Sequence, residues 1–338
     1  MNRDPIVAAA ELLAGAGAVT LLAHVQPDAD SLGSALALGI ALHRRGVAVQ
    51  VSFATPEQMP ESLRILDVYG LVVPPDEVPA EPEVLVACDA AEPARLGALA
   101  DRLGTARHSI MIDHHVTNPG FGQLQLLDPG AEASVVIVRR LLAAMDVPLD
   151  ADVARCIYAG LVTDTSNFIA AGESAHRLAA ELVAAGVDVQ PLVRSLMYTH
   201  PYAWLAALGR VLQDAVLEPD AAGGLGLVHA TVPCVDVERF RTEDVDSVVD
   251  MVRTIAEAEV AAVFKQVSAT RWITSLRSDG RIDVATVAGR LGGGGHPGAA
   301  GFTWEGTADE LLAALRAALT AEPGSSHQGS SDRTGETR

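Results

Sequence analysis

The stretch that decides the fold is residues 110–115, Ile110-Met111-Ile112-Asp113-His114-His115. A short apolar run of this kind indicates a buried strand, and here it ends directly in three ionisable side chains. Residues 84–89 repeat the arrangement, because an apolar run leads straight into Asp89. In open parallel sheets, ligands bind beyond the carboxyl ends of the strands. The two stretches therefore predict a parallel sheet whose strand ends carry chemistry.

Outward from these stretches, strand and helix patterns alternate. We expect further strands at 18–25 and 47–53, and a helix at 31–45 that Gly46 ends. After Glu132 the pattern becomes helical, with helices expected at 132–145, 150–161, 174–185 and 189–198. Strands that alternate with helices indicate an α/β domain with a parallel sheet and helices on both faces.

Strand patterns return in the last third of the chain, and they predict a smaller domain of α+β type. The expected strands are 225–232, 260–267 and 272–276, and the expected helices are 243–257, 284–290 and 308–319. We therefore predict a first domain at 1–195, a linker at 196–224 and a second domain at 225–321. The tail at 322–338 is polar and without periodicity, so we expect it to be disordered.

Composition limits the possible partners. The 43 acidic and 24 basic residues give a formal net charge of −19, which argues against binding of long duplex nucleic acid. A short phosphorylated substrate remains possible, because bound metal ions can neutralise its charge. Three widely spaced cysteines make a disulfide framework improbable. We find neither a signal peptide nor an apolar run of membrane-spanning length, so we expect a cytoplasmic protein without membrane contact.

The segment after the first expected strand contains His24, Asp28 and Asp30. Pro27 keeps this segment extended, so the two aspartates project to the same side and could reach two neighbouring cations. The alternative is that Asp30 or Ser31 only caps the next helix. The three residues together, at the end of a strand, favour metal binding.

Three further segments add polar side chains, and each of them also has an explanation that involves no metal. Asp89 could be a turn residue, the 113–115 run could begin a solvated loop, and Asp164 could belong to a helix terminus. Taken together they form an oxygen-rich set with imidazoles, which suits Mn²⁺ or Mg²⁺ better than a structural zinc. So many carboxylates repel one another unless two divalent cations compensate them. The candidate metal ligands are His24, Asp28, Asp30, Asp89, His114 and Asp164.

A glycine-rich run at 291–301 is the last candidate. Consecutive glycines let backbone N–H groups converge on an anion, and His296 could then touch a phosphate or a base. Arg277 precedes the run and could pair with phosphate through two hydrogen bonds. The alternative is a flexible loop between a helix and a strand. The combination of glycines, histidine and arginine favours binding.

With these motifs in this order, the sequence resembles the DHH phosphoesterase family, and the glycine-rich run resembles its type 1 DHH-associated C-terminal domain. Length and the single linker are similar to the nanoRNase/pAp phosphatase branch, some members of which also hydrolyse cyclic di-AMP or its linear product pApA. The resemblance implies a hydrolase of phosphoric ester bonds, with its active site in the cleft between the domains.

The resemblance also implies a role for each motif residue. His24 and Asp28 would hold one Mn²⁺, and Asp89 would bridge to a second. Asp30, His114 and Asp164 would bind only the second ion. Catalysis would depend on Asp89, on His115 at the scissile phosphate or leaving oxygen, and on Asp113, which orients an imidazole. The substrate-binding residues would be His115, Arg277, Gly294, Gly295 and His296.

The implied function is manganese-dependent hydrolysis of short nucleotides, with Mg²⁺ or another divalent cation as an alternative metal. Oligoribonucleotides, pApA, cyclic di-AMP and 3'-phosphoadenosine 5'-phosphate (pAp) all stay open as substrates. Three other functions compete with it: an inorganic pyrophosphatase, a single-strand exonuclease of the same superfamily, and a nucleotide sensor that binds without cleaving. We also expect a homodimer, for which the apolar helices after Glu132 could supply the interface.

Overall fold

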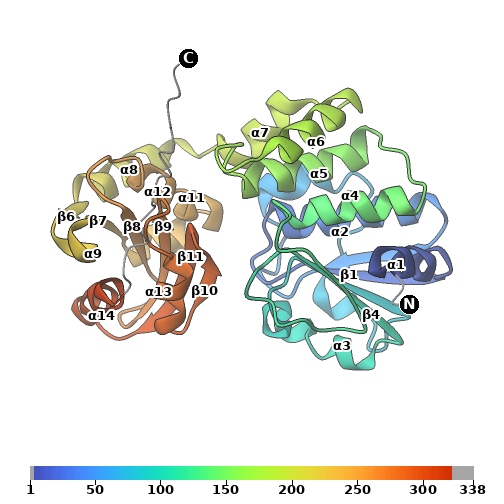
Figure 1. Cartoon of the computed structure of the whole chain (residues 1–338), viewed down its shortest axis with the longest axis horizontal. Coiled ribbons are helices and arrows are strands. Elements are labelled where there is room, and N and C mark those ends of the chain that lie inside the picture. The colour runs from blue at the N-terminus through green and yellow to red at the C-terminus, as the bar shows by residue number, and fades with distance from the viewer. Residues whose placement is uncertain (1–3, 322–338) are drawn as a thin grey trace, which may run out of the picture. The chain divides into compact units, whose positions relative to one another are not determined.

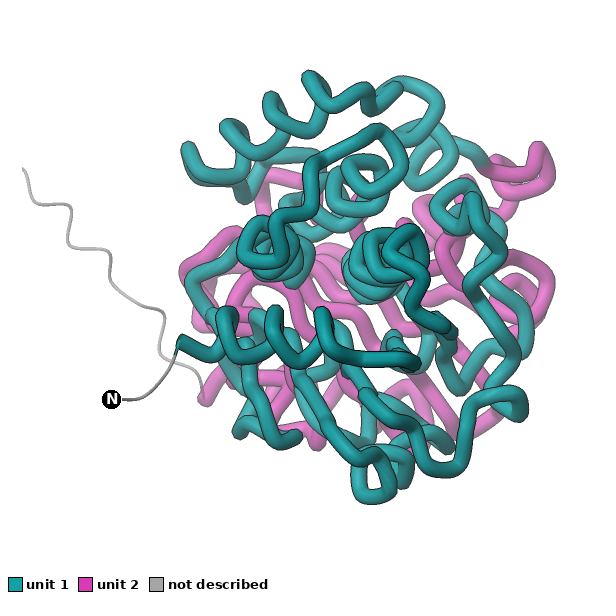
Figure 2. Tube along the Cα trace, turned by 90° about the vertical axis from the view of Figure 1, so that its right-hand side faces the viewer, with its two compact units in different colours: residues 1–199 teal, residues 200–338 magenta. Residues whose placement is uncertain are grey.

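The computed structural model describes residues 4–321, so the predicted disordered tail at 322–338 lies outside the described residues. The described residues form two compact units, which divide between Thr199 and His200 and which Figure 2 shows in different colours. Within the described residues, no helix is both long enough and apolar enough to cross a membrane.

The first unit contains a sheet of five parallel strands in the order β2-β1-β3-β4-β5, as the sequence predicts. The strand order changes direction between β1 and β3, and such a switch point is where ligands bind in open α/β sheets. The short edge strand β5 was not predicted. The bounds are β1 Ala18–Leu22, β2 Ala48–Ser52, β3 Val84–Cys88, β4 His108–Asp113 and β5 Leu124–Leu127.

Both faces of this sheet are buried, which explains the unbroken apolar character of its strands. In β3, Val84, Val86 and Cys88 pack in the core that α1, α2 and α4 cover (Figure 1). Leu85 and Ala87 point to the opposite face, where they pack with side chains of the short 3₁₀ helix η3. The prediction of helices on both faces is therefore confirmed, with long helices on one face and short ones on the other.

The helices expected after Glu132 are present as α4 to α7. The helix α1 was not predicted; Asp4 caps its start by accepting a hydrogen bond from the N–H of Ile6. The helical elements of the first unit are α1 Pro5–Ala14, α2 Ala29–Arg44, η1 Glu61–Leu66, η2 Pro75–Glu77, η3 Pro93–Leu99, α3 Arg102–Thr105, α4 Ser134–Ala144, α5 Ala151–Asp164, α6 Glu173–Ala184 and α7 Val189–Met197.

The second unit is of the predicted α+β type. Its six-stranded sheet has the order β10-β11-β9-β8-β7-β6; β7 and β8 are parallel, and the other neighbours are antiparallel. One face packs on α13 and α14 and the other on α8 and α12. The strands are β6 Val216–Glu218, β7 Leu227–Val232, β8 Val260–Gln266, β9 Arg271–Ser278, β10 Gly294–His296 and β11 Ala299–Glu305.

Two parts of the second unit differ from the sequence-based expectation. The segment expected as a linker, 196–224, contains α8 and β6, and β6 is part of the sheet. The helix expected at 243–257 is two short helices, α11 and α12, which meet at Ser247. The helices of this unit are α8 Tyr202–Gln213, α9 Ala221–Gly224, α10 Cys234–Arg239, α11 Thr242–Asp246, α12 Val248–Val252, α13 Val284–Arg290 and α14 Ala308–Thr320.

Candidate metal centre

Three neighbouring strands of the first unit deliver polar side chains to one edge of the sheet. His24 and Asp28 follow β1, Asp89 follows β3, and Asp113 ends β4. Because the strands are parallel, these carboxyl ends lie side by side. The chain leaves β3 through a left-handed residue, since Asp89 has a φ of 57°, a conformation that is uncommon outside glycine and is found at functional sites.

The structure corrects the expected geometry around Asp28. Asp28 is extended and is itself the cap of α2, because its Oδ1 accepts a hydrogen bond of 2.9 Å from the N–H of Ser31. The alternative interpretation placed the cap at Asp30 or Ser31, which lie inside the first turn of the helix. The expected extended segment therefore ends before Asp30, because the helix begins at Ala29. Asp28 still turns its other oxygen toward His24, with Oδ2 at 3.3 Å from Nε2.

Asp30 is fully buried and is held by the start of α4. Its two oxygens accept hydrogen bonds from the N–H groups of Ser134, at 2.7 Å, and Val135, at 2.9 Å. The first amides of a helix have no partner within the helix and favour negative charge. The same Ser134 donates its hydroxyl to Asp89 Oδ1 at 2.8 Å. Ser134 was not singled out from the sequence, where the only signal was a serine near the start of an expected helix.

Asp89 belongs to three groups of possible metal ligands among residues 4–321. Its carboxylate forms one group with His24 and Asp28, a second with Asp30 and His114, and a third with Asp113 and His115. In each group, the candidate ligand atoms lie within 4.8 Å of one another. Asp164, at the end of α5, joins the second group, since its Oδ2 lies 3.2 Å from His114 Nε2. The structure thus brings the six predicted ligands together around Asp89.

Both imidazoles in these groups are oriented by backbone carbonyls. The Nδ1 of His24 lies 2.8 Å from the carbonyl oxygen of Val25, and the Nδ1 of His114 lies 3.2 Å from that of Ala131. A carbonyl can only accept, so each Nδ1 carries the proton and each Nε2 faces the carboxylates. This arrangement is typical of metal-binding histidines, so the residues fit a bound cation.

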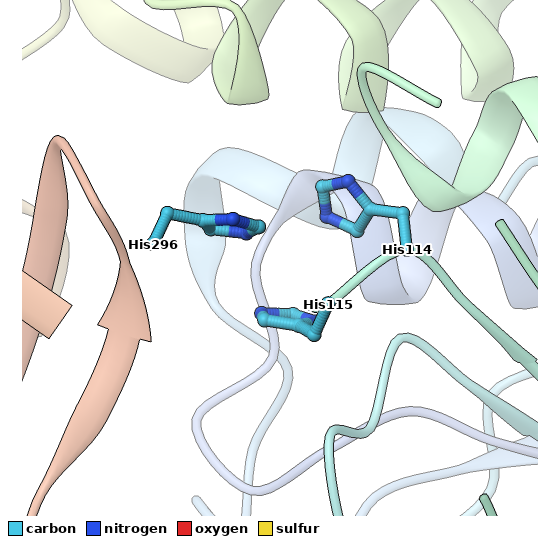
Figure 3. A group of neighbouring side chains, drawn as sticks. All are labelled: His114, His115 and His296. Carbon is cyan, nitrogen blue, oxygen red and sulfur yellow. The ribbon is translucent and has the colours of Figure 1, made fainter. Parts of the chain in front are cut away.

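In the group of Asp89, Asp113 and His115, the last two side chains are also paired with each other. His115 Nδ1 is 2.7 Å from Asp113 Oδ1, and Asn118 donates its amide to Asp113 Oδ2 at 2.5 Å. Figure 3 shows the separate directions of the His114 and His115 rings, whose planes differ by 67°. Asp113 is fully buried, but Val116, directly after the run, is 63% exposed, so the run connects the buried end of β4 to an exposed turn. Asn118 was not identified as a candidate from the sequence.

Three of the four acidic ligands lack sufficient positive charge, whereas against burial His24 and Ser31 lower the pKa of Asp28. Burial, and then the nearby Asp89 and Asp164, raise the pKa of Asp30 well above its ordinary value. Burial and Asp28 raise the pKa of Asp89. Burial, against the hydrogen bond from His114, raises the pKa of Asp164 to about 6. Carboxylates respond in this way when like charges are buried together, and divalent cations would remove the cause.

The histidines show the complementary effect. Burial disfavours a charged imidazole, yet Asp28 and Asp89 raise the pKa of His24 to about 9. Against the same burial, Asp164 and Asp30 raise the pKa of His114 to about 10. The surrounding carboxylates thus favour positive charge at this position. In the chain alone, that charge is supplied by protons on the two imidazoles.

Four of the five predicted substrate-binding residues lie on two strands of the second unit, β9 and β10, and the fifth, His115, belongs to the first unit. His296 of β10 is opposite Ala299 of β11, which is opposite Arg277 of β9. Directly opposite residues share a face of a sheet, so Arg277 and His296 lie on the same face. Residues 294–296, for which a flexible loop was the alternative, form a strand. Arg277 Nε lies 3.7 Å from Asp250 Oδ1.

Comparisons with known proteins agree with this geometry. The family model described as "DHH family, N-terminal domain" matches residues 18–161, and the DHHA1 domain model matches residues 227–321. The bifunctional oligoribonuclease and PAP phosphatase NrnA of Thermus thermophilus is 34% identical over 90% of this chain and 91% of its own. The cyclic-di-AMP phosphodiesterase GdpP of Bacillus subtilis is 24% identical over 85% of this chain and 45% of its own.

One solved structure shows the same fold over nearly the whole chain. An exopolyphosphatase-related protein from Bacteroides fragilis matches with a TM-score of 0.83 and 23% identity, over 93% of this chain and 95% of its own. At that identity the likeness concerns the fold, which includes both units.

Proposed function

Because the chain belongs to the DHH family and is a hydrolase of phosphoric ester bonds, we propose that it cleaves short nucleotides with two divalent cations, preferably Mn²⁺. The observation that carries this proposal is the position of Asp89, whose carboxylate is shared by the group with His24 and Asp28 and the group with Asp30 and His114. A carboxylate shared in this way is suited to bridge two cations.

The chain offers each cation its own ligands. His24 and Asp28 would hold one ion with Asp89, and the ligands of the other would be Asp30, His114, Asp164 and the same Asp89. Bound there, the cations would lower the pKa of a water molecule and neutralise charge on the phosphate. A mixture of carboxylates and imidazoles, without cysteine, favours Mn²⁺ or Mg²⁺ over a structural zinc.

His115 is suited to move a proton. Burial opposes its charge, but the hydrogen bond to Asp113 raises the pKa of His115. Burial alone would raise the pKa of Asp113, but the hydrogen bond with His115, and then that from the amide of Asn118, lower it. The ionised Asp113 accepts the hydrogen bond from Nδ1, so the remaining proton of His115 is on Nε2. From there it could be given to the leaving oxygen as the ester bond breaks.

The proposed substrates are oligoribonucleotides, pApA, cyclic di-AMP and pAp. The relatives support this choice, since their names include an oligoribonuclease, a PAP phosphatase and a cyclic-di-AMP phosphodiesterase. From the second unit, we expect Arg277, Gly294, Gly295 and His296 to bind the substrate, with the guanidinium on a phosphate group. The homodimer and the cytoplasmic location stay predictions.

The decisive variant is Asp89→Ala. With Mn²⁺ present, we expect release of AMP from pApA to fall by more than about 10³-fold, the upper range for loss of a single transition-state donor. The matched control is Asp214→Ala, which removes an exposed carboxylate at the end of α8 and should leave the rate unchanged. Activity retained in Asp89→Ala would contradict the proposal.

The competing functions require substrate comparisons. Rates on pAp, pApA, a short oligoribonucleotide and cyclic di-AMP should be measured side by side with Mn²⁺, with pyrophosphate as a fifth substrate. Faster cleavage of pyrophosphate than of any nucleotide would favour the pyrophosphatase. Binding of cyclic di-AMP with no product from any substrate would favour the sensor.

A further inference from the structure

The loops that follow β1 and β3 are joined beside the metal centre. The N–H of Val25, next to His24, donates a hydrogen bond of 2.7 Å to the carbonyl oxygen of Arg95. Gly97 makes the close approach possible: its φ is 57°, and a Cβ there would lie 2.7 Å from Val25 Cγ1 and 2.9 Å from Ala54 Cβ. The backbone at Arg95 is thereby fixed against the segment that carries His24.

The side chain of Arg95 has no hydrogen bond or ion pair with any residue in the described range 4–321, and it is exposed. Arg64, Arg107 and Arg194 of the first unit also show no side-chain partner among residues 4–321, so it is the position beside His24 that distinguishes Arg95. Most arginines of the first unit contact a carboxylate or a backbone carbonyl. Those with such a contact are Arg44, Arg45, Arg102, Arg139, Arg140, Arg155 and Arg177.

Val25 directly follows His24 in the chain. The hydrogen bond between the N–H of Val25 and the carbonyl oxygen of Arg95 therefore places the backbone of Arg95 beside a proposed metal ligand, on the His24 side of the centre.

We propose that Arg95 binds a second phosphate group of the substrate, adjacent to the one that is cleaved. The inference rests on the proposed function, and it gives the first unit its own means of selecting substrates with two phosphates. An unpaired guanidinium offers its full set of donors, in a fork that matches two phosphate oxygens. The scissile phosphate itself would be compensated by the cations around Asp89, whereas Arg95 is fixed beside His24.

The experiment compares pApA, which has two phosphates, with ApA, which has only the scissile one. For Arg95→Gln with Mn²⁺, we expect KM for pApA to rise about 10- to 100-fold, as for loss of hydrogen bonds from a charged donor, with kcat changed less than about threefold. Activity on ApA should be unchanged. Arg95→Lys should recover part of the affinity, because it keeps the charge without the fork.

Arg107→Gln is the matched control. Arg107 is also exposed, and its side chain also has no partner among residues 4–321. It directly precedes β4 and so lies at the opposite end of the sheet from the centre. Equilibrium binding of pApA to Asp89→Asn, with and without Arg95→Gln, should show the same 10- to 100-fold loss without turnover.

The outcomes separate the two proposals. If wild type cleaves pApA and Arg95→Gln behaves like Arg107→Gln, the inference about Arg95 is overturned alone. A fall in kcat on both pApA and ApA would also overturn it, since Arg95 would then act on the scissile phosphate. A wild type that cleaves neither substrate would contradict the proposed function first.

Discussion

Each unit buries carboxylates, and Asp30 and Asp89 of the first unit differ from Glu259 of the second in the groups that surround them. In the second unit, Glu259 accepts hydrogen bonds from Ser278 Oγ, at 2.9 Å, and from the backbone N–H and Nε of Arg281, at 2.7 and 2.8 Å. Burial opposes its charge, but these donors lower the pKa of Glu259. In the first unit, burial and neighbouring acids raise the pKa of Asp30 and Asp89.

The difference shows how a structural acid can be told from a functional one. A buried carboxylate that holds the fold together finds its donors within the chain, as Glu259 does, and stays ionised at little cost. A buried carboxylate among other carboxylates is stable only when positive charge is added from outside. The raised pKa of Asp30 and Asp89 therefore marks a site that is short of positive charge, whereas Asp113, whose donors are His115 and Asn118, has a lowered pKa as Glu259 does.

Removal of metal should have the largest effect. Chelation should abolish activity, and addition of Mn²⁺ at 100 times its dissociation constant should stabilise the first unit by about 2.7 kcal/mol. The three tryptophans, Trp204, Trp272 and Trp304, all belong to the second unit. Mn²⁺ should therefore shift the circular-dichroism unfolding curve and leave the tryptophan fluorescence transition nearly in place. A curve that does not respond to Mn²⁺ would contradict the assignment of the centre.

Gly160→Ala tests how the helices position the acids. A Cβ at Gly160 would lie 2.7 Å from Asp30 Oδ1 and 2.7 Å from Val135 Cγ1, so Asp30 must move. We expect about a 10²-fold loss of kcat/KM, typical of a small misplacement, and about 1–3 kcal/mol of lost stability. The control is Gly289→Ala in α13, where a Cβ would meet no atom within 4 Å. Equal effects of the two substitutions would sink this interpretation.

Asp113→Asn should reduce activity by about 10- to 100-fold, the usual loss for a residue that orients a reacting group. Because Asp113 raises the pKa of His115, its loss should lower that pKa. If protonated His115 is the acid, the high-pH limb of the rate profile should then move to lower pH. An unchanged pH profile of kcat would show that His115 does not donate the proton.

Glu259→Gln should have the smallest effect, on stability alone. We expect the second unit to lose about 1–3 kcal/mol at pH 7, measured by tryptophan fluorescence during denaturation. The folded pKa of Glu259 is below its ordinary value of 4.5, so its stabilisation is present above that pH and is lost as the pH falls through the folded pKa. The variant should therefore be less acid-sensitive below about pH 4.5 than wild type. Equal acid sensitivity would show that Glu259 is not the responsible group.

Local pattern was sufficient for much of the fold. The apolar run at 84–88 is a strand with the predicted bounds, and the helix expected at 284–290 is α13. Pattern was insufficient where an element is stabilised mainly by distant packing. The segment at 243–257 forms two helices instead of one. The edge strand β6 was assigned to the linker because a strand of three residues is too short to show an alternation of apolar and polar side chains.

The sequence by itself determined which side chains leave the sheet at its carboxyl edge. A strand that ends in Asp89, or in the 113–115 run, presents those residues wherever the rest of the chain goes, because the end of a strand is set by local pattern. The order and spacing of these motifs were also enough to show the resemblance to the DHH family.

Only the tertiary structure decided how those side chains meet. Asp89 lies in three groups of possible ligands, Ser134 donates hydrogen bonds to both Asp30 and Asp89, and Asn118 donates one to Asp113. The contact between Asp30 and Ser134 joins residues 104 positions apart, and no local pattern specifies such a pair. The strand order, which places β3 beside β1, and the approach of α4 to α2 create these contacts, and with them a group of acids that the chain alone does not neutralise.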